Sequence, residues 1–320
     1  MSKLGLKSKV AIGLGLALLL IVIGGLFFPV PQPDVHLSAN YGGHVPEPFY
    51  KLGPIYITNT LITSWLSIIV LAGIFYFATR RMRLVPKGLQ NLAETAIETL
   101  LGFVEGVAGK KNGRRFFAVI ATIFLYVLFN AWLGLLPIFN FIGIGHTGTA
   151  SGAFFGDYSG FIVDVAIFRA ANTDINVPLM LALVSFISVE YWGFTSLGVR
   201  TYAGKFLRFR QLLLGLGYLV KGRVKSALSA ILFGAIDVFV GILELLSEFV
   251  RIISFTFRLF GNMTAGEVLL LMMAFLVPWV VAIPFYGLEM LLGAIQALIF
   301  CALTLVFATM AVTPHETEHD

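Results

Sequence analysis

Long apolar runs, separated by short polar and basic stretches, make up most of the pattern of hydrophobic and polar positions in this chain. The first four runs cover residues 10–28, 60–78, 116–136 and 177–199. A run of about 20 apolar residues is long enough to cross a hydrocarbon core of roughly 30 Å as a helix. The pattern therefore predicts a series of membrane helices.

The last two apolar runs are longer than an upright membrane helix needs. At a rise of 1.5 Å per residue, residues 226–277 would form a helix of about 78 Å and residues 285–312 one of about 42 Å. The longer run must therefore be steeply tilted, broken or divided into two spans. We expect five to six membrane helices, ending in a long, strongly tilted helical hairpin over residues 226–312.

Composition supports the same fold class, an all-α polytopic membrane protein. Of the 320 residues, 58% are hydrophobic and 12% are charged, whereas a soluble domain is about half apolar and a quarter charged. The net charge of +5 comes from Lys and Arg clusters between the apolar runs. This placement is typical of topology signals and argues against nucleic-acid binding. The single cysteine, Cys301, excludes an internal disulfide.

The basic clusters also predict which loops face the cytoplasm. Residues 80–83, 110–115 and 200–225 are rich in Lys and Arg, and such loops are retained on the cytoplasmic side. Residues 31–57 and 138–172 then lie outside. The C-terminus is expected in the cytoplasm.

The two ends of the chain differ from the membrane domain, which we assign to residues 58–320. Residues 1–30 combine a basic start, an apolar run and prolines, a pattern that fits either a signal anchor or a cleaved signal peptide. Residues 31–57 form an external segment punctuated by Pro and Gly. The acidic tail, 315–320, contains two histidines, but we expect it to be solvated and not a metal site.

Two further segments have patterns of their own. Residues 87–108 carry apolar positions at helical spacing with Gln, Asn and Glu between them, which predicts an amphipathic helix. This helix would lie on the cytoplasmic membrane surface or against a partner helix. Alternatively, its polar residues would form the solvated face of a packed helix. Residues 143–148 match the glycine spacing of a nucleotide-binding turn. With no strand expected before them and no helix clearly after them, we interpret them as a flexible external loop.

A stripe of polar residues runs through the apolar run 226–277. Its members fall within an arc of about 80° on an ideal helix: Asp237, Glu244, Glu248, Arg251, Phe255, Arg258 and Asn262. Glu248 and Arg251 could pair at i, i+3, whereas Arg258 has no acid at i±3 or i±4. An arginine within the bilayer costs roughly 2.5–3.5 kcal/mol on insertion scales and cannot lose its proton. Such a residue normally serves a function.

The last apolar run offers a second polar face. Glu289, Gly293, Gln296 and Phe300 share it at i, i+4, i+7 and i+11. Gln296 alone would more often hydrogen-bond a neighbouring helix, but Glu289 on the same face favours a hydrated surface.

These segments closely resemble subunit a of the F-type ATP synthase membrane sector. The motifs are Leu243-Glu244-Leu245-Leu246, Arg258-Leu259-Phe260-Gly261-Asn262-Met263, Ala265-Gly266-Glu267, and Glu289 seven residues before Gln296-Ala297. The resemblance runs from about residue 58 to 312 and includes Pro86-Lys87-Gly88-Leu89-Gln90, Leu133-Gly134-Leu135-Leu136-Pro137 and Asp174-Ile175-Asn176.

The resemblance implies a stator subunit that carries ions through two offset half-channels to and from carboxylates of a rotating c-subunit ring. Arg258 would separate the half-channels, with Gln296 beside it. Glu267, Glu289 and Asn262 would belong to the outer half-channel and Glu244 to the inner one. The weaker candidates for ion translocation are Glu248, Asp237, Asp174 and Asn176.

The resemblance also implies partners and a location. These are the c-ring, the b subunit of the peripheral stalk, other ATP synthase subunits and the lipid bilayer, in a bacterial inner membrane. The transported ion is expected to be a proton rather than sodium. No cofactor or metal is implied, and the chain on its own would not be catalytic.

Three positions depart from the family pattern. Glu267 and Glu289 are both acids, where the family often has one histidine. Ala131 stands where an intramembrane asparagine is usual; Asn130 precedes it, about 100° around the helix. Arg251 stands at a common proline position.

Two other function classes fit the sequence less well. A secondary ion transporter with a charged midplane site would predict inverted repeats, but the two halves show no internal similarity. An intramembrane enzyme would require a catalytic motif, and none occurs in a plausible context.

Overall fold

The computed structural model of this chain describes most of its residues and nearly all of the apolar runs predicted from residue 60 onward. The described residues are 12–13, 15–16, 18–20, 22–23, 50–52, 55–136, 142–150, 158–166, 168–206, 213, 224–276 and 282–313. Most of the predicted signal segment 1–30, much of the external segment 31–57 and the tail 315–320 lie outside this set.

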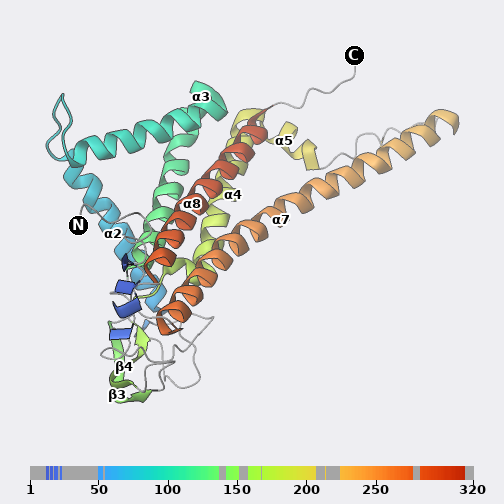
Figure 1. Cartoon of the computed structure of the whole chain (residues 1–320). Coiled ribbons are helices and arrows are strands. Elements are labelled where there is room, and N and C mark those ends of the chain that lie inside the picture. Colours follow the sequence, from blue (N-terminus) through green and yellow to red (C-terminus); the bar gives the residue numbers. More distant parts are fainter. Residues whose placement is uncertain are drawn as a thin grey trace. The chain divides into compact units, whose positions relative to one another are not determined.

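Helices dominate the described chain (Figure 1). The elements are β1 (Tyr50–Leu52), β2 (Ile55–Ile57), α2 (Asn59–Thr79), α3 (Leu89–Gly134), β3 (Gly143–Ala150), β4 (Tyr158–Ala166), η2 (Ala171–Thr173), α4 (Asn176–Leu197), α5 (Val199–Phe206), α7 (Val224–Leu276) and α8 (Ala282–Val312). Within the described ranges, α2, α3, α4, α7 and α8 are long and apolar enough to cross a membrane. The predicted all-α, polytopic membrane fold is confirmed.

Helix α3 joins two segments that the sequence distinguishes, an amphipathic part and a membrane span. The backbone leaves helical geometry at Gly109, with φ 74° and ψ 160°, a conformation that glycine adopts without a Cβ clash. Gln90, which the periodicity placed on the polar side, is buried. Its Nε2 donates to the Arg83 carbonyl and to Glu94, and the Arg83 N–H donates to its Oε1. Gln90 therefore fastens the turn between α2 and α3.

The segment interpreted as a flexible loop contains a β-hairpin. Strands β3 and β4 pair antiparallel from Gly143 with Ala166 to Ala150 with Tyr158, with an irregularity between Ile144 and Gly145. The loop prediction is therefore wrong for these residues. Strand β3 contains threonines and an isoleucine between its glycines, and β4 is rich in β-branched and aromatic residues, which favour strand pairing. The glycines of 143–148 lie within a strand and not in a strand-to-helix turn, which agrees with rejecting a nucleotide site.

The chain divides into two compact units, each built from several segments. Unit 1 contains residues 1–94, 123–177 and 258–299. Unit 2 contains residues 95–122, 178–257 and 300–320.

Polar contacts fasten the helices of unit 1. The Ser67 hydroxyl donates to Asn130 Oδ1 at 2.7 Å, and Ser64 and Tyr126 hydroxyls share a hydrogen bond of 2.6 Å. These contacts join α2 to the second part of α3. Trp132 Nε1 donates to the Met290 carbonyl of α8 at 3.1 Å. Hydrogen bonds of this kind substitute for the hydrophobic effect between helices in lipid.

Aromatic packing and a hydrogen bond fasten the helices of unit 2. The rings of Phe116 and Trp192 lie 4.4 Å apart, and those of Phe255 and Phe300 lie 4.8 Å apart. Ser185 of α4 and Thr304 of α8 share a hydrogen bond of 2.8 Å.

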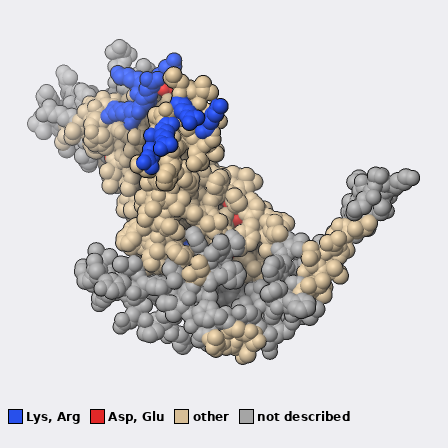
Figure 2. Space-filling view, turned by 90° about the vertical axis from the view of Figure 1, so that its left-hand side faces the viewer, with Lys and Arg blue, Asp and Glu red and all other residues tan. Residues whose placement is uncertain are grey.

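Basic side chains are conspicuous on the surface. Arg80, Arg81 and Arg83 follow α2 and are exposed. Figure 2 shows a group of Lys and Arg side chains on an otherwise largely uncharged face. This distribution is what a membrane protein with basic loops requires.

Candidate functional site

The candidate site in unit 1 begins where α7 and α8 pair. Asn262 Nδ2 of α7 donates to Gln296 Oε1 of α8 at 2.8 Å. Gln296 is only 2% exposed, and its Nε2 has no hydrogen-bond partner in the described part of the chain. Arg258 lies one helical turn before Asn262 on α7 and is half-buried. The unit thus places a permanent cation one turn from a pair of amide side chains.

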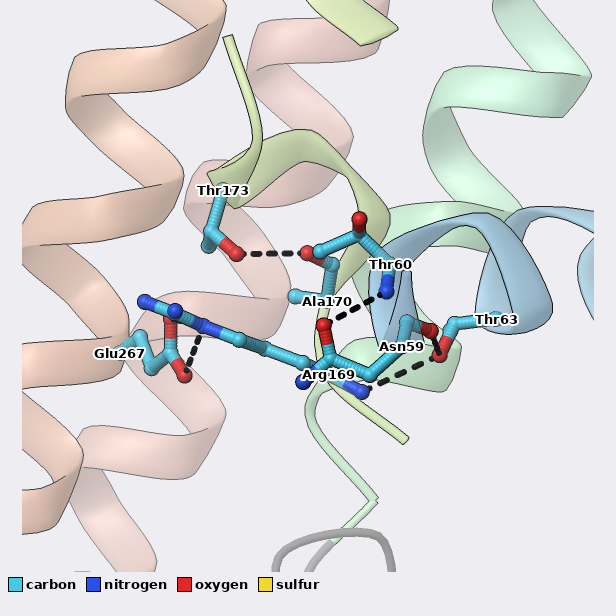
Figure 3. A network of polar contacts seen from close by, with 7 residues as sticks. All are labelled: Asn59, Thr60, Thr63, Arg169, Ala170, Thr173 and Glu267. Carbon is cyan, nitrogen blue, oxygen red and sulfur yellow. Dashed lines mark hydrogen bonds and ion pairs between the residues drawn. The ribbon is translucent and has the colours of Figure 1, made fainter. Parts of the chain in front are cut away.

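Glu267 forms a buried ion pair with Arg169, which stands shortly before η2. Arg169 Nε lies 3.0 Å from Glu267 Oε1 and 3.1 Å from Oε2. The two side chains are 12% and 16% exposed. The Arg169 side chain reaches across to the carboxylate from backbone that lies beside α2 (Figure 3). This pair links α7 to the segment that precedes α4.

The second acid, Glu289 on α8, is 2% exposed and lies directly against α7. Its carboxyl group occupies the space that a Cβ at Gly266 would need, so any larger residue there would overlap it. This close approach requires glycine at position 266.

A small cavity in unit 1 connects the two acids. It is lined from α3, α7, α8 and the segment before η2 by residues that include Ala131, Ala170, Met263, Glu267, Tyr286 and Glu289. About 20 Å³ is open to the centres of water molecules, which is room for at least one water. The geometry therefore places two carboxyl groups beside a space that is large enough to hold water.

The asparagine near the end of α3 does not contribute to this cavity. Asn130 is fully buried and accepts the hydrogen bond from Ser67 of α2, whereas Ala131 lines the cavity. A Cβ added at Gly293 of α8 would lie 2.8 Å from the Ala131 Cβ, so α3 and α8 approach each other closely here. The displacement of about 100° noted in the sequence separates the two positions.

The weaker candidates Asp174 and Asn176 form the start of α4. Asp174 Oδ1 accepts from the Asn176 N–H at 3.0 Å and from its Nδ2 at 2.9 Å. Asp174 Oδ2 accepts from the Thr60 hydroxyl at 3.0 Å. These contacts resemble an N-cap and fasten the turn to α2.

The remaining candidates lie on the part of α7 that belongs to unit 2. Glu248 and Arg251 form the i, i+3 ion pair that the sequence allowed, with an N–O distance of 2.6 Å. The Arg251 guanidinium also lies 3.5 Å from the centre of the Phe307 ring, a cation–π contact. Asp237 and Glu244 are half-buried.

Unit 2 also contains a polar contact that the sequence motifs do not include. Tyr202 of α5 packs against Gly193 and has Glu190 of α4 as a hydrogen-bond partner. Burial, together with the nearby Glu190 carboxylate, raises the pKa of the Tyr202 hydroxyl. This tyrosine therefore stays protonated at physiological pH.

The described residues offer no metal site of the usual kind. No group of three or more His, Cys, Asp or Glu side chains in them is arranged to hold a metal ion.

A protein-family model described as ATP synthase A chain matches residues 61–309. The chain belongs to this family. This match confirms the resemblance to ATP synthase subunit a that the motif beginning at Arg258 indicates.

Individual members of the ATP synthase A chain family are similar over most of this chain. ATP synthase subunit a of Gloeobacter violaceus is 30% identical over 271 residues, which cover 84% of this chain and 90% of that protein. ATP synthase subunit a 2 of Bradyrhizobium sp. is 28% identical over 82% of this chain and 92% of that protein. ATP synthase subunit a of Helicobacter acinonychis is 29% identical over 84% of this chain and 95% of that protein.

Sequence reasoning missed Arg169, the ion-pair partner of Glu267. The two residues are 98 positions apart, so helical spacing could not connect them. The available signal was an arginine among apolar residues, five positions before Asp174 in a quoted motif.

Proposed function

We propose that this subunit carries protons through two offset half-channels, to and from carboxylates of a rotating c-subunit ring. As a member of the ATP synthase A chain family, it works within an ATP synthase and serves ion translocation in the membrane sector. The observation that carries the finer proposal is the arrangement in unit 1. There a permanent cation, a pair of amides and a cavity with two buried acids follow one another along α7 and α8.

The cavity beside Glu267 and Glu289 would form part of the outer half-channel. A carboxyl group that borders water inside a membrane can accept a proton and pass it on. Asn262, four residues after Arg258 and five before Glu267, would stand between the cavity and the arginine. The room for water supports this reading.

Arg258 would separate the two half-channels. A nearby positive charge favours the ionised form of a carboxyl group, so a ring carboxylate that reaches Arg258 would release its proton before it passes. Arginine cannot give up its own proton. Gln296 Nε2, which has no hydrogen-bond partner among the described residues, could donate a hydrogen bond to the same carboxylate.

The inner half-channel would use the part of α7 that lies in unit 2. Glu244 is the first candidate there, with Asp237 as a weaker one. Glu248 is already paired with Arg251, which favours a structural role for it.

The ring and the other subunits would contact the exposed apolar surface of this chain. Only 11% of the most apolar window in α7 is buried within the chain. At 53 residues, α7 is about 80 Å long, more than twice the roughly 30 Å hydrocarbon core. A strongly inclined helix against a ring would use this length. The b subunit and lipid would cover other apolar faces.

The basic loops support an orientation in a bacterial inner membrane with the C-terminus in the cytoplasm. Residues 58–320 would then form the membrane domain, with 31–57 outside and 1–30 as signal anchor or signal peptide.

ATP-driven acidification of inverted membrane vesicles tests the proposal. We expect Arg258→Ala to abolish acidification and to increase passive proton leak, because no charge then separates the half-channels. Arg83→Ala, at an exposed position outside the site, is the matched control and should pump normally. Acidification at the parental rate by Arg258→Ala, with the subunit content unchanged on a blot, would contradict the proposal.

A further inference from the structure

A second cavity lies in unit 2, between α4 and α7. About 340 Å³ of it is open to the centres of water molecules, which is room for a group of waters. Two of its lining residues are acids and the others are apolar: Phe186, Glu190, Leu245, Glu248, Phe249 and Ile252. Glu190 stands within the apolar run of α4 and belongs to none of the sequence motifs quoted above. A carboxyl group inside a membrane helix is costly and is normally retained for a function.

One of the two acids, Glu248, is committed as an anion. Its carboxylate pairs with Arg251 at 2.6 Å, and the guanidinium lies 3.5 Å from the centre of the Phe307 ring of α8. Because the guanidinium cannot lose its proton, a protonated Glu248 would leave a buried cation without its counter-charge, which is costly. Among the lining residues that the structure describes, proton exchange therefore falls to Glu190.

The second acid, Glu190, has a partner that suits both of its protonation states. This partner is the Tyr202 hydroxyl of α5. Burial and the Glu190 carboxylate raise the pKa of this hydroxyl, so it keeps its proton at physiological pH. A hydroxyl group both donates and accepts hydrogen bonds. Tyr202 can therefore donate to the Glu190 carboxylate and accept from the Glu190 carboxylic acid, a choice that an arginine does not offer.

The chain folds back after α4 and so brings Tyr202 to this place. Gly198 has φ 80°, a conformation that glycine adopts without a Cβ clash. The Gly198 N–H donates to the Phe194 carbonyl at 3.0 Å, and the Tyr202 N–H donates to the Gly198 carbonyl at 3.0 Å. Tyr202 is 1% exposed, and its ring fills the space that a Cβ at Gly193 would need. The hydroxyl is thereby presented at a defined point.

The charged and titratable groups around Glu190 come from four elements. Helix α7 supplies the compensated ion pair of the cavity and, one turn before it, Glu244, which does not line the cavity. Helix α5 supplies the neutral Tyr202 hydroxyl, and α3 supplies Arg115, which is hydrogen-bonded to hydroxyl groups at the end of α4. Residues 300–312 of α8 carry no charged side chain. Among the described lining residues, protonation of Glu190 therefore sets the net charge of the cavity.

The cavity lies toward the cytoplasmic end of α4 in the proposed topology. Glu190 stands seven residues before Leu197, the last residue of α4, which is about 10 Å along a helix. At that end, Arg115 of the basic segment 110–115 donates to Ser196 Oγ at 2.7 Å. Basic segments of this kind are retained in the cytoplasm. The cavity therefore borders the proposed inner half-channel.

We infer that Glu190 of α4 binds and releases the transported proton at this cavity, and that Tyr202 is a positioning residue that holds the Glu190 carboxyl group in both protonation states. The inference rests on the proposed function and adds an acid of α4 to the inner half-channel, beside the α7 candidate Glu244. During pumping, a proton arrives from cytoplasmic water, forms an O–H bond with a Glu190 carboxylate oxygen and leaves through water to a ring carboxylate. Its departure breaks that O–H bond and regenerates the Glu190 carboxylate.

Inverted vesicles suit the test because their outer medium bathes the cytoplasmic side. ATP-driven acidification is measured while the pH of the medium and of the lumen are varied separately, and subunit content is measured by blot. Glu190→Gln should lower the rate by about tenfold or more; a positioned proton-transfer group typically contributes about 10²–10⁴-fold, and water in the cavity carries the remaining flux. Glu98→Gln, at an exposed position of α3, is the matched control and should pump normally. A parental rate for assembled Glu190→Gln would overturn the inference.

The pH dependence identifies the side on which Glu190 acts. Relative to the parent, Glu190→Gln should change the dependence of the rate on medium pH and leave the dependence on lumen pH as it was. Glu190→Asp keeps a titratable carboxyl group and should retain more of the rate than Glu190→Gln. A change confined to lumen pH would place Glu190 on the outer path and overturn the assignment.

Tyr202→Phe separates positioning from packing, because it keeps the ring against Gly193 and removes only the hydroxyl. We expect a lower rate and a changed dependence on medium pH, since Glu190 then loses this hydrogen-bond partner in both states. In a Glu190→Gln background the same substitution should have little further effect, because the two side chains act as a unit. A Tyr202→Phe profile identical to the parental one would overturn the positioning role.

Labelling of the parental complex supplies a readout that requires no variant. Dicyclohexylcarbodiimide is an apolar reagent that reacts with protonated carboxyl groups: the acid adds across a C=N bond, and the adduct rearranges to a stable N-acylurea without loss of atoms. Mass spectrometry of the subunit should find this adduct on Glu190, in amounts that fall as the medium pH rises, and not on Glu248. No adduct on Glu190 at any pH, or an adduct on Glu248 in its place, would overturn the assignment.

The failure of this inference is distinguishable from the failure of the proposed function. Parental pumping by Glu190→Gln, beside a loss of pumping in Arg258→Ala, would overturn the inference alone. Parental pumping by Arg258→Ala would contradict the proposed function itself.

Discussion

Gly266 shows how the site depends on the size of a single residue. The Glu289 carboxyl group occupies the space that any Cβ at position 266 would enter, so the contact between α7 and α8 depends on a hydrogen atom in place of a side chain. The two acids Glu267 and Glu289 are thereby brought to one cavity from different helices.

Gly266→Ala should therefore lower proton transport. Overpacking of this kind costs typically about 1–3 kcal/mol, and relief would require the Glu289 side chain to move away from its place at the cavity. Gly287→Ala on α8 is the matched control, because nothing lies within 4 Å of a Cβ there. The measurement is the acidification rate per assembled subunit. Equal rates for both variants would contradict the close approach of Gly266 and Glu289.

Prediction at the residue scale succeeded where the relation between residues is local. Glu289 and Gln296 are two turns apart on one helix, and Glu248 and Arg251 are one turn apart, so helical spacing indicates both relations. The Arg169–Glu267 pair depends on how α2, η2 and α7 pack in unit 1, and one sequence contains no local trace of that packing.

At the scale of elements, the bend in α3 separates an amphipathic segment from a membrane span. Hydrophobic period alone distinguishes the two parts, since one has apolar positions on one face and the other is apolar throughout. The hairpin β3–β4 was missed for the opposite reason. Its glycines are typical of loops, and cross-strand pairing is not visible in either strand alone.

Gly109→Ala should destabilise this bend. The backbone at Gly109 has φ 74° and ψ 160°, a region that costs a residue with a side chain on the order of 1–3 kcal/mol. Gly106→Ala, in regular helix with no atom within 4 Å of its Cβ, should be neutral or stabilising by up to about 1 kcal/mol. The readout is the temperature at which the subunit is lost from the detergent-solubilised complex. A higher temperature for Gly109→Ala than for Gly106→Ala would contradict the account of the bend.

At the scale of the whole molecule, the proposed topology requires that successive loops lie on opposite sides of the membrane. The basic residues after α2 and around α5 should face the cytoplasm, and the segment between α3 and α4 should face outside. Length and hydropathy predicted the membrane spans because each span is a local property of the chain, while the division into two units depends on contacts between distant segments.

Cysteine labelling tests this topology. In a Cys301→Ser background, a cysteine at Arg83 or Lys205 should react with an impermeant maleimide only from the cytoplasmic side. A cysteine at Ser151 or Gly42 should react only from outside. Labelling of positions 83 and 151 from the same side would contradict the span count.

The most direct test of the central claim is ATP-driven acidification by vesicles that carry Arg258→Lys. Lysine preserves the charge count, but a buried lysine can lose its proton, and it lacks the planar five-donor group that can exchange one carboxylate for the next. The account predicts that the variant assembles with normal subunit content and loses most of its pumping. Pumping close to the parental rate would contradict the claim that position 258 supplies a permanent charge of fixed geometry.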